Sequence, residues 1–495
     1  MSARLLARTP RSLLAAGVVL AAVAAPLTLA PSAGAATPAT YADDFNGDGY
    51  RDLVMLGGDH TRTNRVTVVY GTSTGPGTRV QTFNQDSAGI PGAAETDDGW
   101  GDAATTADLD RDGYADLVVS SPGEDVGEIR DRGGLTVIWG SATGLASSGT
   151  VLSSPVQPAS PGQGDSFGGD VASGDFDGDG DTDLAAISNS TEGVVLLQGP
   201  FTRAGGKQGW ASLGGSYGYL SASQLAAGRV TNDAATDLYV FGRDLTAADA
   251  SYESAFFHRG GAGFTSKAGQ LNYADDLGGT FGPAGPQTAI GDFDKDGYGD
   301  LAVGRWSETP DKGRGYVVVK YGSSTGPSTS RGAVTFHQDT AGVPGARETE
   351  DYFGSSVAAG DVNGDGYADL AIGASGEDLG SVRNAGTVTV LLGRAGGLSG
   401  TGAKAYDQNT GGVAGAPETE DRFGGDLKFT DYTRDGRADL VVGTNDQVST
   451  GIPARWGLIH LLNGSSAGTT GTGSRSWSVI SLKLSANRLA APFAH

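Results

Sequence analysis

The sequence predicts an all-β fold, a seven-bladed β-propeller of four-stranded blades, and three observations support this prediction. An acidic segment of ten residues occurs seven times, at intervals of 54 to 70 residues. A short apolar strand follows each copy, and a second strand that ends at or near glycine comes next. Each unit of about 65 residues has short glycine-rich loops and no helical periodicity, and it has room for four ordinary strands.

The first element in the chain is an expected secretory signal peptide over residues 1–36. Three arginines precede an apolar run over residues 13–25, and small residues at 33–36 offer a cleavage site. The run is short for a membrane span, and no later stretch is apolar enough to cross a membrane. The sequence therefore predicts a secreted protein with no membrane span, a propeller over 37–482 and a loosely ordered C-terminal tail over 483–495.

The acidic segments follow the signal peptide and occupy the rest of the chain in phase. The copies are DFNGDGYRDL from Asp44, DLDRDGYADL from Asp108, DFDGDGDTDL from Asp175, the eroded RVTNDAATDL from Arg229, DFDKDGYGDL from Asp292, DVNGDGYADL from Asp361 and DYTRDGRADL from Asp431. An aromatic-glycine pair precedes most copies, at Trp100-Gly101, Phe167-Gly168, Phe281-Gly282, Phe353-Gly354 and Phe423-Gly424. Three units share a linker, FNQDSAGIPGAAETDD, FHQDTAGVPGARETED and YDQNTGGVAGAPETED. Seven copies predict seven blades.

Each acidic segment has the pattern of a calcium-binding loop. Side-chain oxygens at positions 1, 3, 5 and 9, with a backbone carbonyl at position 7, suit a hard cation that takes six to eight oxygen ligands. Glycine at position 6 permits the positive φ that folds a short loop around an ion. The ion would cancel the repulsion between carboxylates beside a buried strand. The alternative is an acidic turn that binds no metal.

Five copies carry the full set of candidate Ca²⁺ ligands, and a sixth site is expected to be weaker. The five sets are Asp44, Asn46, Asp48, Tyr50 and Asp52; Asp108, Asp110, Asp112, Tyr114 and Asp116; Asp175, Asp177, Asp179, Asp181 and Asp183; Asp292, Asp294, Asp296, Tyr298 and Asp300; and Asp361, Asn363, Asp365, Tyr367 and Asp369. The weaker site, with Thr433 at position 3, would use Asp431, Asp435 and Asp439. Arg229 and Thr231 should exclude a cation from the eroded copy.

Composition and motif spacing exclude several other functions. An EF-hand needs a glutamate at position 12, where the complete copies and the one from Asp431 hold apolar residues. The net charge of −23 disfavours nucleic acid as a partner. The chain has no cysteine, and none of its five histidines forms an i, i+4 pair. Two GxSxG patterns, at residues 71–75 and 322–326, are each followed by proline rather than a helix. An enzyme is therefore not predicted.

The repeats resemble the FG-GAP repeat family, in particular the seven-bladed propeller at the head of integrin α chains. The aromatic-glycine pair, the DxDxDGxxDL loop and the strand after it carry this resemblance, which covers residues 40–482. The "GAP" tripeptide survives only loosely, as in Gly373-Ala374-Ser375. The resemblance implies structural calcium and a role in extracellular binding or cell adhesion. The alternatives are a carbohydrate-binding propeller and a secreted hydrolase with its site in the propeller channel.

The partner is expected to be an extracellular protein or glycan that binds the face opposite the calcium loops. Strands in a blade run up and down, so the loops between the second and third strands and the inter-blade linkers share that opposite face. These loops hold aromatic and arginine residues, the usual anchors of recognition surfaces: Arg130, Tyr252, Arg305, Trp306 and Trp456. The alternative is that the tryptophans cap the cores of the blades. Two modes of ring closure stay open. The strand near Trp477–Leu482 could complete the seventh blade alone, or an N-terminal strand could supply an edge.

Overall fold

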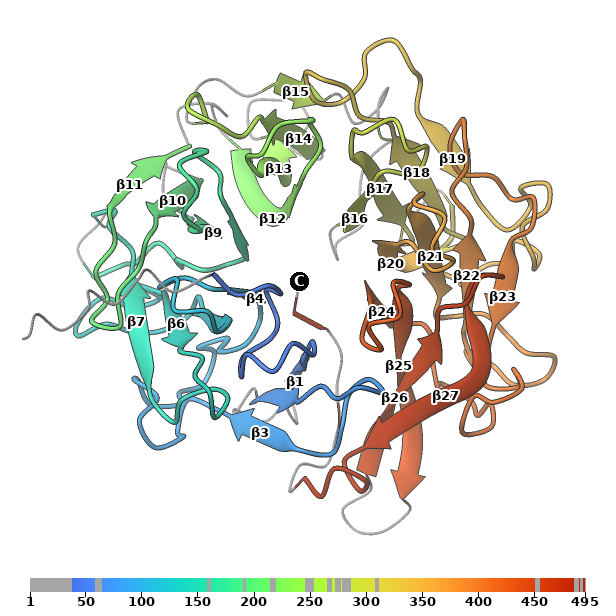
Figure 1. Ribbon diagram of the computed structural model, residues 1–495, viewed down its shortest axis with the longest axis horizontal. Helices are drawn as coiled ribbons and strands as arrows, with labels where there is room; N and C mark the ends of the chain where they lie inside the picture. The colour runs from blue at the N-terminus through green and yellow to red at the C-terminus, as the bar shows by residue number, and fades with distance from the viewer. Residues whose placement is uncertain are drawn as a thin grey trace, which may run out of the picture. The chain divides into compact units, whose positions relative to one another are not determined.

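The seven predicted repeats fold into seven antiparallel sheets arranged as a β-propeller, so the fold prediction is confirmed (Figure 1). The computed structural model describes residues 38–57, 65–157, 162–189, 193–213, 220–244, 253–264, 269–271, 277, 286–307, 311–449, 455–484, 489 and 493–494. The predicted signal peptide, the Phe281-Gly282 pair and Tyr252 lie outside the described residues.

Six of the sheets have four described strands in chain order, and the first sheet has three. Blades 1 to 4 contain β1 (Leu53–Gly57), β2 (Arg65–Val69), β3 (Val80–Phe83), β4 (Ala104–Ala107), β5 (Asp116–Ser121), β6 (Gly134–Ile138), β7 (Gly149–Ser153), β8 (Val171–Gly174), β9 (Asp183–Ile187), β10 (Val194–Gln198), β11 (Gly209–Ser212), β12 (Leu220–Gly228), β13 (Asp237–Asp244), β14 (Glu253–His258) and β15 (Gly269–Leu271). Blades 5 to 7 contain β16 (Gln287–Gly291), β17 (Asp300–Arg305), β18 (Tyr316–Lys320), β19 (Val334–Phe336), β20 (Phe353–Gly360), β21 (Asp369–Ala374), β22 (Thr387–Leu391), β23 (Lys404–Tyr406), β24 (Asp426–Thr430), β25 (Asp439–Ser449), β26 (Arg455–Asn463) and β27 (Thr470–Ser478).

The core lies between neighbouring blades, which explains why the central strands are apolar on both faces. All six residues of β5 are buried. Val118 and Val137 of blade 2 belong to the same apolar cluster as Leu184 and Val195 of blade 3. A strand covered on both faces needs no alternation of apolar and polar residues, so it appears in the sequence as a continuous apolar run.

The aromatic-glycine pairs fit the boundary between two blades. Phe423 is fully buried, and its ring centroid lies 5.3 Å from that of His460. Gly424 has a φ of +87°, and a Cβ there would lie 2.7 Å from the side chain of Val388 and 2.8 Å from the carbonyl oxygen of Thr387 in the preceding blade. The aromatic ring therefore fills the inter-blade core, while glycine allows the backbone its close approach.

The C-terminus completes the innermost position of the first blade. β1 follows the first acidic loop as β5 follows the second, so blade 1 has no described counterpart of β4. Phe493 forms an antiparallel bridge with Met55, and the amide of Ala494 donates to the carbonyl of Val54 at 3.3 Å. Figure 1 marks the C-terminus at the centre of the ring.

These contacts differ from the loosely ordered tail that was expected. Among the described tail residues, Leu484, Leu489, Phe493 and Ala494 are buried. The physical reason is that the free inner edge of blade 1 offers backbone partners that the sequence pattern alone does not reveal. The predicted boundary at residue 482 itself stays a prediction.

The seventh blade is complete without a strand from the N-terminus, as β24 to β27 form its sheet. Its outer strand also contacts blade 1. The indole Nε1 of Trp477 donates to the carbonyl of Gly77 at 2.9 Å, and Arg475 Nη1 donates to the carbonyl of Thr74 at 2.6 Å. The last strand of the repeats therefore completes the seventh blade alone, which is the first of the two expected modes of closure. At the inner edge, the C-terminus adds to blade 1.

Candidate metal centres

The acidic loops connect the two inner strands in blades 2 to 7, and in blade 1 the loop from Asp44 leads into β1. In blade 2 the loop over residues 108–115 joins β4 to β5, and Gly113 at position 6 has a φ of +94°. Position 4 is also left-handed, with Arg111 at +57°. The loop therefore turns sharply twice, which brings side chains two positions apart in the sequence toward a common point.

The aspartate at position 1 organises the turn. In blade 2 the Asp108 carboxylate accepts the backbone amides of Asp112 at 3.1 Å and Gly113 at 3.0 Å. In blade 6 the Asp361 carboxylate accepts those of Asp365 at 3.2 Å and Gly366 at 2.7 Å. At position 5 the carboxylate accepts the amide of position 7, as Asp112 does from Tyr114 at 3.1 Å.

The aspartate at position 9 has a structural role that the ligand pattern did not predict. In blade 2 the buried Asp116 accepts the amide of Leu109 at 2.9 Å and that of Gly140, just after β6, at 2.8 Å. The same glycine contact recurs in every blade, from Gly71, Gly199, Gly260, Gly322, Gly393 and Gly464 to Asp52, Asp183, Asp237, Asp300, Asp369 and Asp439. The retention of this aspartate in the eroded copy was the available sequence signal.

Carboxylates at positions 1, 3 and 9 converge in three loops. Each of these sets has ligand oxygens within 4.8 Å of one another: Asp108, Asp110 and Asp116; Asp175, Asp177 and Asp183; and Asp292, Asp294 and Asp300. The Oδ1 atoms of Asp110 and Asp294 are buried and have no hydrogen-bond partner. Buried carboxylate oxygens without a donor are suited to a cation, so the three loops could each hold a metal ion, and the two with these unpartnered oxygens fit one best.

In the loops of blades 1 and 6, position 3 is asparagine. The amide of Asn46 donates to Asp48 at 2.9 Å, and that of Asn363 donates to Asp365 at 3.0 Å. Positions 3 and 5 therefore lie side by side in both loops. Each amide also carries the oxygen that the predicted ligand set requires.

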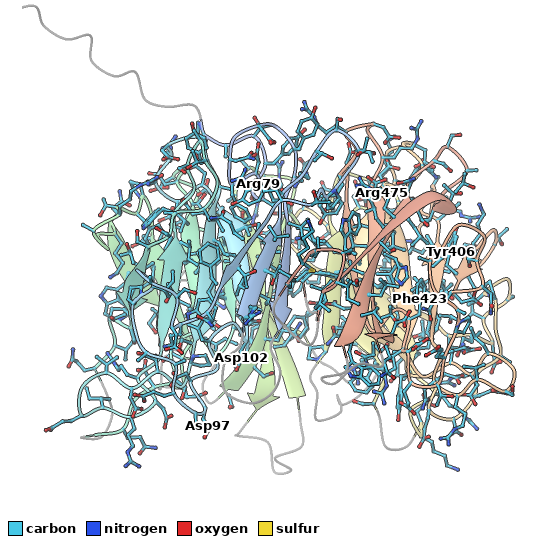
Figure 2. The ribbon with its side chains drawn as sticks, turned by 90° about the horizontal axis from the view of Figure 1, so that it is seen from below. Arg79, Asp97, Asp102, Tyr406, Phe423 and Arg475 are labelled. Carbon is cyan, nitrogen blue, oxygen red and sulfur yellow. The ribbon has the colours of Figure 1, made fainter. Side chains whose placement is uncertain are left out.

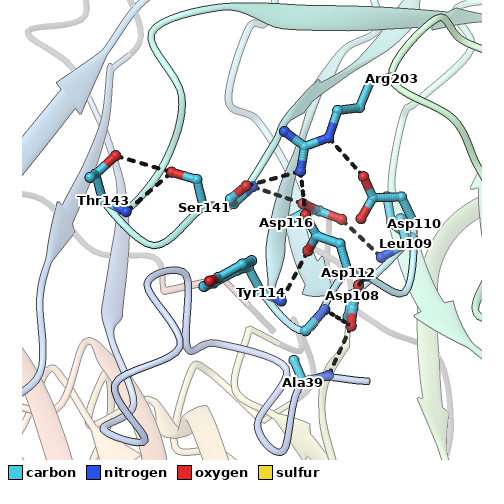
Figure 3. A network of polar contacts seen from close by, with 12 residues as sticks. Ala39, Asp108, Leu109, Asp110, Asp112, Tyr114, Asp116, Ser141, Thr143 and Arg203 are labelled. Carbon is cyan, nitrogen blue, oxygen red and sulfur yellow. Dashed lines mark hydrogen bonds and ion pairs between the residues drawn. The ribbon is translucent and has the colours of Figure 1, made fainter. Parts of the chain in front are cut away.

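Arginines from the outer loops approach two of the acidic loops that carry the complete ligand set. Arg203 of blade 3 pairs with Asp110 at 2.8 Å and Asp112 at 2.6 Å in blade 2 (Figure 3). Arg331 pairs with Asp294 in blade 5. These guanidinium groups neutralise part of the negative charge of the loops, a contribution that the sequence pattern did not reveal.

Burial makes the charged state of the position 9 carboxylates costly in the absence of a cation. Burial, with smaller contributions from the neighbouring loop aspartates, raises the pKa of Asp52 and Asp116 to about 8. It raises the pKa of Asp300 and Asp369 to about 7 in the same way. A bound divalent ion would favour the ionised form of each carboxylate.

The two incomplete loops hold other partners. In the eroded copy Arg229 donates to the carbonyl of Asp233 at 2.8 Å, and the hydroxyl of Thr231 donates to Asp237 at 2.9 Å. In blade 7 Arg437 pairs with Asp435 at 3.1 Å. Arg229, the arginine that should exclude a cation, therefore bonds within the eroded loop. In the blade 7 loop, Arg437 supplies a positive charge beside one of the candidate ligands.

The opposite face differs in part from the predicted recognition surface. Trp456 is 41% exposed, and Arg130 is also exposed. Arg305, however, is fully buried and donates to the carbonyl of Leu277 at 2.9 Å, so its prediction as an exposed anchor was wrong. Trp306 is half-buried against Tyr352, at a centroid distance of 5.4 Å.

The fold and the acidic loops define a β-propeller built from in-phase repeats. Family models match an FG-GAP repeat at residues 100–139, 284–319 and 353–391, and an FG-GAP-like repeat at residues 44–119. The chain therefore contains FG-GAP repeats, and part of its propeller resembles that of an integrin α chain.

Two relatives match parts of the chain. Integrin alpha-PS2 of Drosophila melanogaster is 39% identical over 93 residues, which are 18% of this chain and 6% of that protein. Phosphatidylinositol-glycan-specific phospholipase D of Rattus norvegicus is 27% identical over 170 residues, 33% of this chain and 18% of that protein. The chain thus matches only a small part of either relative.

Two solved structures were also found to be similar. The Dos1 propeller has a TM-score of 0.36 at 9% identity, covering 88% of this chain and 86% of that one. A subtype N11 neuraminidase-like protein of A/flat-faced bat/Peru has a TM-score of 0.32 at 12% identity, covering 86% of this chain and 95% of that one.

Among the described residues, no helix has the length and apolar character needed to cross a bilayer.

Proposed function

We propose that this protein is a secreted, calcium-stabilised propeller that serves as an extracellular binding module and not as an enzyme. The observation that carries the proposal is the convergence of three carboxylates within 4.8 Å in the loops at Asp108, Asp175 and Asp292. Orphaned oxygens on Asp110 and Asp294 support it further. When bound, calcium would supply positive charge that holds each loop closed beside the two inner strands.

The calcium part of the proposal is tested by metal removal. We expect about five ions per molecule, each with a Kd on the order of 10⁻⁴–10⁻³ M, as in other extracellular calcium modules. A chelator should lower the melting temperature, and Asp365→Ala should lower it less, because only one of several sites is lost. A melting curve that is the same with calcium and with chelator would contradict structural calcium.

The binding part rests on the face opposite the acidic loops. A cavity of about 320 Å³ is lined there by Glu420, Arg422, Asn445 and Trp456. An exposed tryptophan beside an arginine is a combination typical of binding hot spots. We expect the calcium-loaded protein to bind a cell-surface fraction or a glycan array saturably, and Trp456→Ala to weaken that binding. Ile480→Ala, at a residue that is 47% exposed, is the matched control.

The expectation that the protein is not an enzyme is tested with candidate substrates, including the class named for the partly matching phospholipase D. We expect no release of product when the protein is incubated with a phosphatidylinositol glycan or with polysaccharide and ester substrates. Two of the three described histidines, His258 and His460, are buried, which supports this expectation in part, while His337 is half-buried. Turnover that is abolished by substituting an acidic residue in the channel would instead support the hydrolase alternative.

A further inference from the structure

A second kind of acidic site lies at three junctions between blades, on the face opposite the acidic loops. Each is built from the linker that three repeats share and from the end of a central strand in the next blade. Figure 2 shows Asp97, in the first of these linkers, on the opposite side of the ring from Arg79 in the loop between β2 and β3. These sites therefore use none of the residues of the acidic loops.

The three junctions share one hydrogen-bond pattern. A buried glutamine, the residue two positions after the outer strand, donates its amide to a carboxylate of the next blade. The pairs are Gln85 with Glu124, Gln338 with Glu377 at 2.5 Å, and Gln408 with Asp446 at 3.1 Å. In each linker a second aspartate accepts a glutamate amide: Asp98 from Glu95 at 2.7 Å, Asp351 from Glu348 at 2.5 Å, and Asp421 from Glu418 at 2.6 Å.

At the junction between blades 6 and 7, these groups lie close enough together to form a coordination site. Carboxylate oxygens of Glu418, Asp421 and Asp446 lie within 4.8 Å of one another. Gln408, whose amide contacts Asp446, is only 4% exposed. Its Oε1 atom is buried and has no hydrogen-bond partner. We call these four residues the junction cluster.

The unpartnered glutamine oxygen points to a ligand that the protein atoms do not provide. A buried amide oxygen without a donor costs about 1–3 kcal/mol unless something satisfies it. Gln338, the equivalent residue at the junction between blades 5 and 6, is 3% exposed and also has an Oε1 without a partner. The same glutamine oxygen thus lacks a partner at two equivalent junctions, which favours one explanation for both.

The charges of the junction cluster call for a positive ligand. Burial, with smaller contributions from the carboxylates of Asp446 and Glu418, raises the pKa of Asp421 to about 6. The pKa of Asp446 is also raised, by burial and then by Glu418. Arg422, the nearest arginine in the linker sequence, pairs with Glu420 at 2.9 Å. Three carboxylates and one amide oxygen form a set of oxygen donors, which suits a hard divalent cation. The set does not suit zinc, because it contains no nitrogen or sulfur donor.

We propose that the junction cluster binds a calcium ion, separate from the acidic loops, at the junction between blades 6 and 7. The ion would connect Gln408, two residues after β23 of blade 6, to Asp446 in β25 of blade 7. It would also fix the linker beside the cavity that contains Trp456. In that position the ion stabilises the packing of two successive blades and orients the linker on the proposed binding face.

Crystals of the full chain soaked in about 10 mM TbCl₃, well above the expected Kd, give the direct test. Terbium replaces calcium on oxygen ligands and scatters anomalously. We expect an anomalous peak between Glu418, Asp421 and Asp446. Absence of this peak overturns the proposal, whether or not the acidic loops are occupied. The failure of the junction site is thereby distinguished from the failure of the calcium-loop proposal.

Calcium stoichiometry in solution gives a second test. Asp446→Asn should lower the number of bound ions by one, as measured by equilibrium dialysis. Glu420→Gln removes a negative charge from the same linker at a residue outside the cluster, so it should leave the number unchanged. An unchanged stoichiometry in Asp446→Asn, or an equal loss in both variants, contradicts the proposal. If Asp446→Asn does not fold, the terbium experiment on the natural chain still decides.

Discussion

The C-terminal closure of the ring makes a quantitative prediction. Phe493 is 1% exposed and belongs to the apolar cluster that joins blades 1 and 7. Truncation of a buried phenylalanine to alanine costs about 3–5 kcal/mol of unfolding free energy. With an unfolding entropy near 2.1 cal/mol/K per residue, a body of about 460 residues should lose roughly 3–5 °C in melting temperature. Phe493→Ala should therefore destabilise the whole ring.

The assay is thermal unfolding at fixed calcium, with hydrogen exchange as a local measure. Ile480→Ala is the control, because Ile480 is 47% exposed and its truncation removes little buried surface. Exchange should accelerate in β1 more than in β21, since only β1 loses its bridge to the tail. A Phe493→Ala protein that melts together with the control, and whose β1 exchanges at the natural rate, would refute the closure.

Three further predictions concern single residues. Burial lowers the pKa of His460 to about 4, below its unfolded value of 6.5, so the unfolded state takes up the proton first and stability falls from about pH 6.5 to pH 4. His460→Leu should remove about 3 kcal/mol of this acid dependence in urea titrations, and an unchanged pH profile would contradict it. Asp237→Ala should lower the free energy of unfolding several times more than Asp233→Ala, both with and without calcium. The reason is that Asp237 is buried and accepts the amides of residues 230, 231 and 260. Equal losses in the two variants would argue against a structural role for Asp237. Arg203→Gln should raise calcium affinity at the blade 2 loop about two- to fivefold in calorimetry, because a competing charge is removed, and a lower affinity would show that the arginine assists binding.

The repeat pattern was sufficient to predict the blades because each one is a local unit. The loop from Asp108, the strand β5 and the glycine after β6 lie within about 35 residues, so their order in the sequence fixes their neighbours in space. The ligand positions could be predicted for the same reason. The second role of the aspartate at position 9 was missed, since a contact from Asp116 to Gly140 spans two strands and depends on their pairing.

The sequence by itself determined the number of blades, the positions of the acidic loops and the face on which each loop type lies. These properties depend on alternation and spacing along a strand, which short-range geometry enforces. The tertiary structure alone decided that Phe493 reaches Met55, that Arg203 enters the loop of another blade, that Arg305 is buried, and that Gln408 meets Asp446. Such contacts join residues tens to hundreds of positions apart. They depend on how one blade packs against the next, and no local pattern encodes that packing.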